Sequence, residues 1–170
     1  MKIGIIGSDL RAAAIGRLLV SGGHEVSFGD PRGLEAAKRI AVEIGSVPET
    51  PYNQAMTRDM VIMATARQDA DRVLGAMGGS CDGVVVDARE GGPLAPHRGA
   101  ELLAHKLDSH AVVRALIVLP QPGANIPICG DDPAAKALVD EAFRACDCLT
   151  TDRGPLANAS ELEPSNAAAA

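Results

Sequence analysis

A glycine-containing turn follows the first apolar run of the sequence, and its residue types are those that can hold phosphates. Gly7 stands where a dinucleotide-binding loop needs a tight turn, and Ala12 stands where the following helix must pack closely on the strand. Unpaired amides and a partial positive charge make the N-terminus of such a helix an anion site. Asp9, however, occupies the position where glycine would let the backbone approach a pyrophosphate.

Asp9 leaves two interpretations of this turn open. Its carboxylate would repel a phosphate about 4 Å away by roughly 4 kcal/mol at an effective dielectric constant near 20, about a thousandfold in affinity. Arg11, in the first helical turn, would offset part of that repulsion. Alternatively, because aspartate is a favoured N-cap residue, Asp9 satisfies the helix amides itself and the turn holds no ligand.

A second group of candidate ligand-binding residues follows the next expected strand, where Asp30, Pro31 and Arg32 come in succession. An acid at this place commonly bonds the ribose 2′-hydroxyl of NAD, whereas a nearby arginine accommodates the 2′-phosphate of NADP. The sequence has both, so it does not decide between the two cofactors. The alternative interpretation is a turn that begins at Asp30 and a solvated charge at Arg32.

Strand and helix patterns alternate along the chain. The expected strands are Lys2–Ile6, Glu25–Phe28, Val61–Ala64, Val84–Asp87, Ala111–Leu119, Ile126–Cys129 and Leu149–Thr151, and the expected helices are Leu10–Val20, Leu34–Ile44, Gln68–Met77, Gly99–Leu107, Pro133–Cys146 and a short one opened by Pro155. Apolar strands that alternate with helices indicate crossover connections and a sheet covered on both faces. We therefore expect a Rossmann-like, doubly wound α/β fold in three layers, with a mainly parallel sheet that binds ligands at the carboxyl ends of its strands.

Length and composition indicate one ordinary folded domain. The chain has 170 residues, of which 46% are hydrophobic and 22% charged. We expect a single domain over residues 1–164 and a frayed tail over residues 165–170. The net charge of −6 disfavours nucleic acid as a partner. No apolar stretch approaches the roughly 20 residues of a membrane helix, and the N-terminus does not resemble a signal peptide, so we expect a cytoplasmic protein with no membrane partner.

The cysteines and histidines show no metal-site spacing. No pair among Cys81, Cys129, Cys146 and Cys148 has the Cys-x-x-Cys arrangement, and we expect reduced thiols. His97, His105 and His110 invite a metal interpretation, but no acid lies at a suitable spacing and a helix would not align His105 with His110. We therefore expect no metal.

Arginines follow several expected strands. One hypothesis is that Arg67, Arg89 and Arg11 contact phosphates and so compensate for the charge of Asp9. For Arg89, Glu90 and Arg98, ion pairs within the loop are the commoner explanation. Arg114 interrupts an apolar strand, and we expect its side chain to reach the end of the sheet and extend to solvent.

Short motifs follow one another in order over nearly the whole chain: Met1–Ser8, Leu18–Val26, Arg32–Gly33, Val86–Ala88, Val112–Ala115, Gly130–Asp132, Gly154–Ala157 and Leu162–Pro164. As a set they resemble the NADP oxidoreductases that depend on the deazaflavin coenzyme F420, and their dinucleotide-binding relatives. The resemblance implies a small-molecule dinucleotide cofactor, NADP or NAD, and coenzyme F420 as a second one, with hydride passing between the two rings. It places Gly7, Ser8, Leu10 and Arg11 along the pyrophosphate, Asp30 and Arg32 near the adenosine ribose, and Ala64, Thr65, Asp87 and Ala88 beside the nicotinamide.

The chain departs from the family pattern at several positions that face the cofactors. The family's asparagine after its Asp-Ala-Thr is Glu90, the asparagine of its Lys-Ala-Phe-Asn strand is Ile117, and its Val-Pro after the fourth strand is replaced by Thr65-Ala66-Arg67. The chain also stops soon after Pro164, so we expect either that a wall of the pocket is missing or that a partner subunit of a homodimer supplies it.

No side chain stands out as a catalytic acid or base, which hydride transfer between two cofactors does not strictly require. Two functions therefore stand side by side. One is an NAD(P)-dependent oxidoreductase, and the other is a degenerate, non-catalytic module that binds nucleotides or proteins on the same fold.

Overall fold

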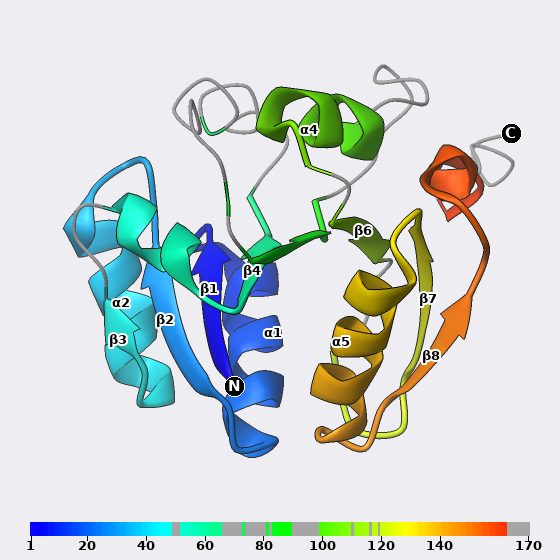
Figure 1. Cartoon of the computed structure of the whole chain (residues 1–170). Coiled ribbons are helices and arrows are strands. Elements are labelled where there is room, and N and C mark those ends of the chain that lie inside the picture. The colour runs from blue at the N-terminus through cyan, green and yellow to red at the C-terminus, as the bar shows by residue number, and fades with distance from the viewer. Residues whose placement is uncertain are drawn as a thin grey trace, which may run out of the picture.

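Among the residues that the structure describes, eight strands form one sheet in the order β3-β2-β1-β4-β5-β6-β7-β8 (Figure 1). This computed structural model describes residues 1–48, 52–65, 73, 81, 83–89, 99–109, 111–115, 117–118 and 120–162. The strands are β1 Lys2–Ile6, β2 Glu25–Gly29, β3 Val47–Pro48, β4 Met60–Met63, β5 Val84–Asp87, β6 Val112–Ala115, β7 Asn125–Gly130 and β8 Leu149–Asp152. All neighbouring strands are parallel except β6 and β7. The mainly parallel, Rossmann-like α/β sheet is therefore confirmed.

Helices cover both faces of the sheet. The helices are α1 Leu10–Ser21, α2 Leu34–Ile44, α4 Gly99–Leu107 and α5 Pro133–Arg144, with 3-10 helices η1 Tyr52–Thr57 and η2 Leu156–Leu162. One core joins α1, α2 and α5 to the sheet around Phe28 and Phe143, and the other joins α4, η1 and η2 to it around Leu103. The two cores on opposite faces give the three layers expected from the sequence.

The strand order reverses at β1, because β2 and β3 lie on one side of β1 and β4 to β8 lie on the other. Ile6 at the end of β1 is in register with Gly29 of β2 on one side and with Met63 of β4 on the other. The carboxyl ends of these strands therefore meet at one edge, at the point where strand order reverses, which is where open α/β sheets bind ligands. The close packing of η1 helps to build this arrangement, because a Cβ on Gly4 would lie 1.8 Å from the carbonyl oxygen of Ala55.

Most element boundaries agree with the expectations to within one or two residues, and three differences are informative. Strand β6 is shorter than the expected Ala111–Leu119, because β5 and β7 offer partners only to Val112–Ala115. The expected strand Ile126–Cys129 exists as β7, but it runs antiparallel to β6. Neither β3 nor η1 was expected.

The helix expected over 68–77, apart from residue 73, and most of the loop expected over 88–98 lie outside the described residues. The same holds for the tail after residue 162. Within the part of the chain that is described, no helix has the length and apolar character needed to span a membrane.

Candidate functional site

The turn between β1 and α1 brings backbone atoms of two strands close together. Gly7 has φ +129°, and a Cβ at this position would lie 2.5 Å from the carbonyl oxygen of Ala64, at the end of β4. A side chain is excluded both by the backbone conformation and by the lack of space. The tight turn that the glycine motif predicts is therefore present, and it places Ala64 directly beside the turn.

Asp9 caps helix α1 with its own side chain. Its Oδ1 accepts a hydrogen bond of 2.9 Å from the amide of Ala12, and its carbonyl oxygen accepts one of 3.0 Å from the amide of Ala13. The structure thus contains the self-capped turn that was one of the two interpretations of Asp9. Leu10, the next residue, has 89% of its surface exposed, so its side chain contributes nothing to the interior of the site.

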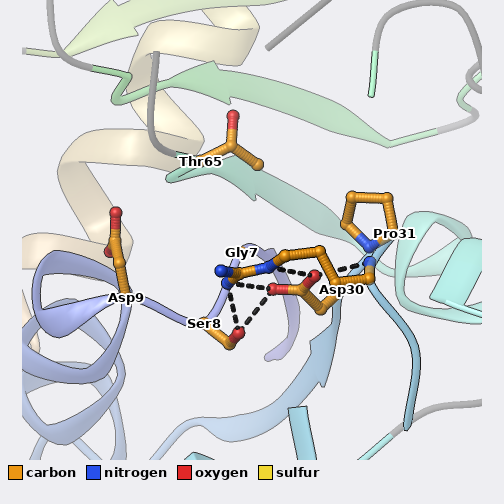
Figure 2. Close-up of a pocket in the computed structure, with 7 residues that line it drawn as sticks. Gly7, Ser8, Asp9, Asp30, Pro31 and Thr65 are labelled. Atoms are coloured by element: carbon orange, nitrogen blue, oxygen red, sulfur yellow. Dashed lines mark hydrogen bonds and ion pairs between the residues drawn. The ribbon is translucent and has the colours of Figure 1, made fainter. Parts of the chain in front are cut away.

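Ser8, Asp30 and Arg32 form a compact polar cluster where β1 and β2 end (Figure 2). The Nε and Nη2 atoms of Arg32 donate to the two carboxylate oxygens of Asp30 over 3.0 and 2.9 Å, and Nη2 also donates to Ser8 Oγ over 2.8 Å. The Ser8 hydroxyl donates in turn to Asp30, as does the backbone amide of Arg32 over 2.7 Å. This bidentate arrangement of a guanidinium on a carboxylate is among the strong forms of an ion pair.

The two charged members of this cluster differ in exposure. The Asp30 side chain is only 1% exposed, whereas that of Arg32 is 43% exposed. Burial raises the pKa of Asp30. The hydrogen bonds from Arg32 and Ser8 and the charge of Arg32 lower it by more than burial raises it, so this pKa lies below its ordinary value. The carboxylate therefore stays ionised behind the guanidinium, and the cluster presents an arginine to solvent.

Thr65, which follows β4, contributes a buried hydroxyl to the same pocket. The pocket is lined by Gly7, Ser8, Asp9, Asp30, Pro31, Arg32 and Thr65. Thr65 is 4% exposed, and its Oγ1 has no hydrogen-bond partner among the described residues. In Figure 2 this oxygen points away from Ser8 and Asp30. An unsatisfied buried hydroxyl costs roughly 1–3 kcal/mol, so a ligand with a polar group that reached it would recover that energy.

A buried ionic cluster occupies the carboxyl ends of β5 and β6. The Nε and Nη2 atoms of Arg89 donate to the Asp87 carboxylate over 2.7 and 2.9 Å, and Nη2 also donates to the carbonyl of Gly99 over 2.8 Å. Arg114 lies 3.8 Å from the same carboxylate and is only 3% exposed. The expectation that Arg114 extends to solvent is therefore wrong, because the carboxylate and the strand-end carbonyls hold its guanidinium inside.

The electrostatics of this cluster favour an ionised carboxylate. Burial raises the pKa of Asp87, but the hydrogen bond from Arg89 and the charges of Arg89 and Arg114 outweigh it, so the pKa lies below its ordinary value. Asp87 is thus paired and buried within the protein, and its carboxylate acts on the site by holding the turn after β5 in place.

Three consecutive backbone carbonyls, beginning with the last residue of β5, each accept a hydrogen bond from a guanidinium group. Nη1 of Arg114 donates to the carbonyls of Asp87 and Arg89 over 2.9 and 2.8 Å, and Nη1 of Arg11 donates to the carbonyl of Ala88 over 3.1 Å. Arg11 belongs to the first turn of α1, so its side chain links the two parts of the site. The family resemblance placed Arg11 along the pyrophosphate, and the sequence did not predict this contact with Ala88.

The structure brings most of the predicted site residues to one edge of the sheet. Gly7, Ser8, Asp30, Arg32 and Thr65 line one pocket, Ala64 adjoins it at the Gly7 turn, and Arg11 meets Ala88. Asp9 and Pro31 also line the pocket. Arg67, Glu90, His97, Arg98 and His110 lie outside the described residues. Within the described ranges, no group of three or more His, Cys, Asp or Glu side chains is arranged to hold a metal ion.

The sequence matches a known protein family over the residues that build this edge of the sheet. The family model described as NADP oxidoreductase, coenzyme F420-dependent, matches residues 2–91, which include the Gly7 turn, the Ser8–Asp30–Arg32 cluster and the ends of β4 and β5. No curated protein matches the sequence.

Solved structures share the fold over almost the whole chain. A hypothetical protein from Sinorhizobium meliloti has a TM-score of 0.77 at 18% identity, with 92% of this chain and 87% of that chain covered. A protein proposed to be an F420-dependent NADP reductase, from Arthrobacter sp. FB24, has a TM-score of 0.75 at 20% identity, with 95% and 88% covered. Prephenate dehydrogenase from Aquifex aeolicus, in complex with hydroxyphenyl propionate and NAD⁺, has a TM-score of 0.72 at 14% identity, and the match covers 91% of this chain but 60% of that one.

Proposed function

Since the chain belongs to the family of coenzyme F420-dependent NADP oxidoreductases, we propose that it binds a nicotinamide dinucleotide and passes hydride between the nicotinamide and a deazaflavin or similar acceptor. The observation that carries this proposal is the Ser8–Asp30–Arg32 cluster beside the Gly7 turn, at the point where strand order reverses. When bound, the nicotinamide ring supplies the hydride chemistry, and the protein supplies position and electrostatics.

The adenosine half of the ligand belongs at the ends of β1 and β2 in this proposal. Gly7 and Ser8 receive the phosphates nearest the adenosine, with the backbone of Leu10 at the start of α1. NADP is preferred over NAD, because the guanidinium of Arg32 faces solvent while the Asp30 carboxylate is buried behind it. A ribose 2′-hydroxyl that sought Asp30 would have to displace Arg32 from a bidentate ion pair.

The nicotinamide half belongs at the ends of β4 and β5. Ala64 and Thr65 follow β4, and Ala88 follows β5. The unsatisfied Oγ1 of Thr65 supports the presence of a polar ligand group, since its missing hydrogen bond is a cost that the bound state would remove. Asp87, held by Arg89 and Arg114, acts as a positioning residue that keeps the turn after β5 in place.

A second function, a non-catalytic module that binds nucleotides or another protein, is favoured by one specific observation. The Asp9 carboxylate already occupies the first-turn amide that a pyrophosphate would use, since it accepts a hydrogen bond from Ala12. In such a module the fold and the polar cluster persist, and hydride transfer does not occur.

Titration calorimetry with NADP⁺ and NAD⁺ tests binding and the preference together. We expect the wild-type chain to bind NADP⁺ more tightly than NAD⁺, and Arg32→Leu to remove about 1.5–3 kcal/mol of that difference, the range for hydrogen bonds to a charged group. Arg153→Leu, at an exposed arginine that directly follows β8, is the charge-matched control. If neither dinucleotide binds to the wild-type chain or to Asp9→Gly, the proposal is wrong.

Stopped-flow mixing with NADPH and oxidised coenzyme F420 then separates the two functions. Loss of the deazaflavin absorbance at the rate of NADPH oxidation identifies an oxidoreductase. Tight binding of NADPH with no transfer to the deazaflavin or to another hydride acceptor would establish the non-catalytic module.

A further inference from the structure

The two edge strands of the sheet are built differently. Among the described residues, β3 and β8 are the last strands on either side, and Figure 1 shows them at opposite ends of the sheet. Strand β3 has only two residues, one of which is Pro48, and shortness and proline both protect an exposed edge from pairing. Strand β8 has four residues, Leu149–Asp152, with neither proline nor lysine. Its outer side therefore keeps backbone groups with which another strand can pair.

The hydrogen bonds between β8 and β7 show which backbone groups of β8 face outward. The amides of Leu149 and Arg153 both donate to carbonyl oxygens on the β7 side, over 2.9 and 2.8 Å. Successive residues of a strand direct their backbone groups to alternate sides, so Thr151 faces β7 as well. The amides and carbonyls of Thr150 and Asp152 therefore point away from the sheet.

These outward groups select one way for two copies of β8 to pair about a two-fold axis. When Thr150 of one copy lies opposite Asp152 of the other, both outward residues of each strand are used, and each pair exchanges two backbone hydrogen bonds. A shift of two residues in one direction puts Asp152 opposite Asp152, and like charges disfavour that register. A shift in the other direction puts Asp152 opposite Cys148, whose amide already donates to the carbonyl of Phe143 over 3.0 Å.

The charged side chains between β8 and α5 also fit this register. Asp152 accepts a hydrogen bond from Lys136 over 2.7 Å, and Thr150 donates one to Asp140 over 2.6 Å. Asp140 is in turn paired with Arg144 over 2.6 Å. The register sets the ion pair at Asp152 of one copy beside the ion pair at Asp140 of the other. Each half of the interface then holds two positive and two negative charges, with Lys136 facing Asp140 of the other copy.

On the face of the sheet away from α5, the same register covers an exposed apolar side chain. Leu149 has 65% of its surface exposed. It lies opposite Arg153 of the other copy, whose aliphatic stem covers it while the guanidinium stays in water. Thr151 lies opposite itself on the two-fold axis, and paired threonines are favourable cross-strand neighbours.

We propose that the outer edge of β8 is the interface of a homodimer, in which two copies pair antiparallel with Thr150 of one opposite Asp152 of the other. The sheets of the two copies become continuous, and both α5 helices lie on the same face. Because β4 to β7 separate β8 from β1, the polar cluster of each copy stays outside the interface, and this inference does not rest on the proposed function. One strand and one helix of each copy make a small interface, so we expect a dissociation constant on the order of micromolar.

Cysteine cross-linking on the full chain tests the register. The Cα atoms of directly opposite residues in a non-hydrogen-bonded antiparallel pair lie about 4.5 Å apart, which a disulfide can span. We expect Thr151→Cys to form a covalent dimer under mild oxidation. Thr150→Cys and Asp152→Cys should not, since neither residue lies opposite itself. The wild-type chain, whose own cysteines are all buried, is the control.

Analytical ultracentrifugation at a series of micromolar concentrations tests the assembly without a cross-link. We expect the wild-type chain to pass from monomer to dimer as its concentration rises. Thr151→Lys should weaken the dimer at least about tenfold, because it sets two positive charges opposite each other. Val47→Lys makes the same change of charge on β3, where Val47 is exposed, and should leave the dimer intact. Circular dichroism shows whether each variant keeps the fold.

The outcomes decide between this interface and its alternatives. A wild-type chain that stays monomeric, with no cross-link in Thr151→Cys, overturns the proposal. A dimer that cross-links through Thr150→Cys or Asp152→Cys instead overturns the register, and a dimer that Thr151→Lys leaves unchanged has its interface elsewhere, which also overturns the proposal. Calorimetry with NADP⁺ on Thr151→Lys and the wild type reports on the proposed function separately, so either conclusion can fail without the other.

Discussion

The Asp9 carboxylate lies 2.9 Å from the amide nitrogen of Ala12 and accepts its hydrogen bond. A full negative charge is thereby fixed at the N-terminus of α1, where the helix would otherwise attract an anion. The residue stabilises the helix and at the same time opposes the proposed ligand, and substitutions can separate these two effects.

Asp9→Asn is expected to raise the affinity for NADP⁺ by at least about tenfold, because it removes a repulsion that reaches roughly 4 kcal/mol at short range. The free energy of unfolding should change little, because asparagine is as good an N-cap as aspartate. Calorimetry and urea denaturation measure the two quantities. Asp9→Ala should gain affinity similarly but lose about 1 kcal/mol of stability with the cap. Unchanged affinity in both variants would contradict the electrostatic argument.

Asp87 should make the stability of the protein depend on pH in the acid range. Because its pKa in the folded state lies below the ordinary value of 3.8, its contribution is complete above that value and is lost as the pH falls through the lowered folded pKa. Asp87→Asn should flatten this part of the profile. At neutral pH it should cost about 3–5 kcal/mol, since it leaves Arg89 and Arg114 buried without their carboxylate.

Urea unfolding at a series of pH values between about 2 and 7 measures this effect. Asp152→Asn is the control, because the hydrogen bond from Lys136 also lowers the pKa of Asp152, but this side chain is 55% exposed. Its substitution should change the profile much less than that of Asp87. Equal effects of the two substitutions would show that the buried cluster has no special role.

Gly7→Ala should be strongly destabilising, because the added Cβ meets the carbonyl oxygen of Ala64 at 2.5 Å in addition to the cost of φ +129°. Gly23→Ala is the matched control, since Gly23 also has a positive φ, +80°, but nothing lies within 4 Å of its Cβ position. The control should cost about 1–2 kcal/mol from backbone strain alone, and Gly7→Ala should cost more. Thermal unfolding followed by circular dichroism compares them. If the two variants are equally stable, the steric argument for the turn is wrong.

The four cysteines should be unreactive in the folded protein. All four cysteines are buried and carry thiols rather than disulfides, and burial together with the neighbouring Cys148 raises the pKa of Cys146 to about 11. Because the thiolate is the reactive form, Ellman's reagent at about pH 8 should react with the native chain only as fast as it unfolds. In denaturant, all four thiols should react promptly. A rapid first equivalent with the native protein would contradict this expectation.

Local sequence signals predicted the described α-helices and most strands, because these signals depend on neighbours along the chain. Helix α2 has the expected bounds, since Gly45 ends it in the left-handed conformation with φ +71°. Strand β7 was harder to predict because Pro127 lies within it. Only Ile128–Gly130 of β7 pair with β6, and Pro127 comes just before them. The amide that proline lacks is therefore not needed for a hydrogen bond to β6.

The site was predictable in its location and less so in its contacts. Motif spacing and the carboxyl-end rule placed Gly7, Asp30 and Arg32 at one edge, and the family resemblance added Ser8; all four line the pocket. The buried position of Arg114 and the reach of Arg11 depend on which strands become neighbours, and one sequence does not reveal strand order. An arginine inside an apolar strand was the available signal, since a buried guanidinium requires a partner.

The carbonyls of Asp87, Ala88 and Arg89 each already accept a hydrogen bond from an arginine, which limits what a small molecule can bind at this end of β5. A compound that brings donors there has to compete with a guanidinium. Amides that rely on main-chain acceptors should therefore be under-represented among the hits of a screen, whereas carboxylates, sulfonates and phosphonates should favour the exposed guanidinium of Arg32.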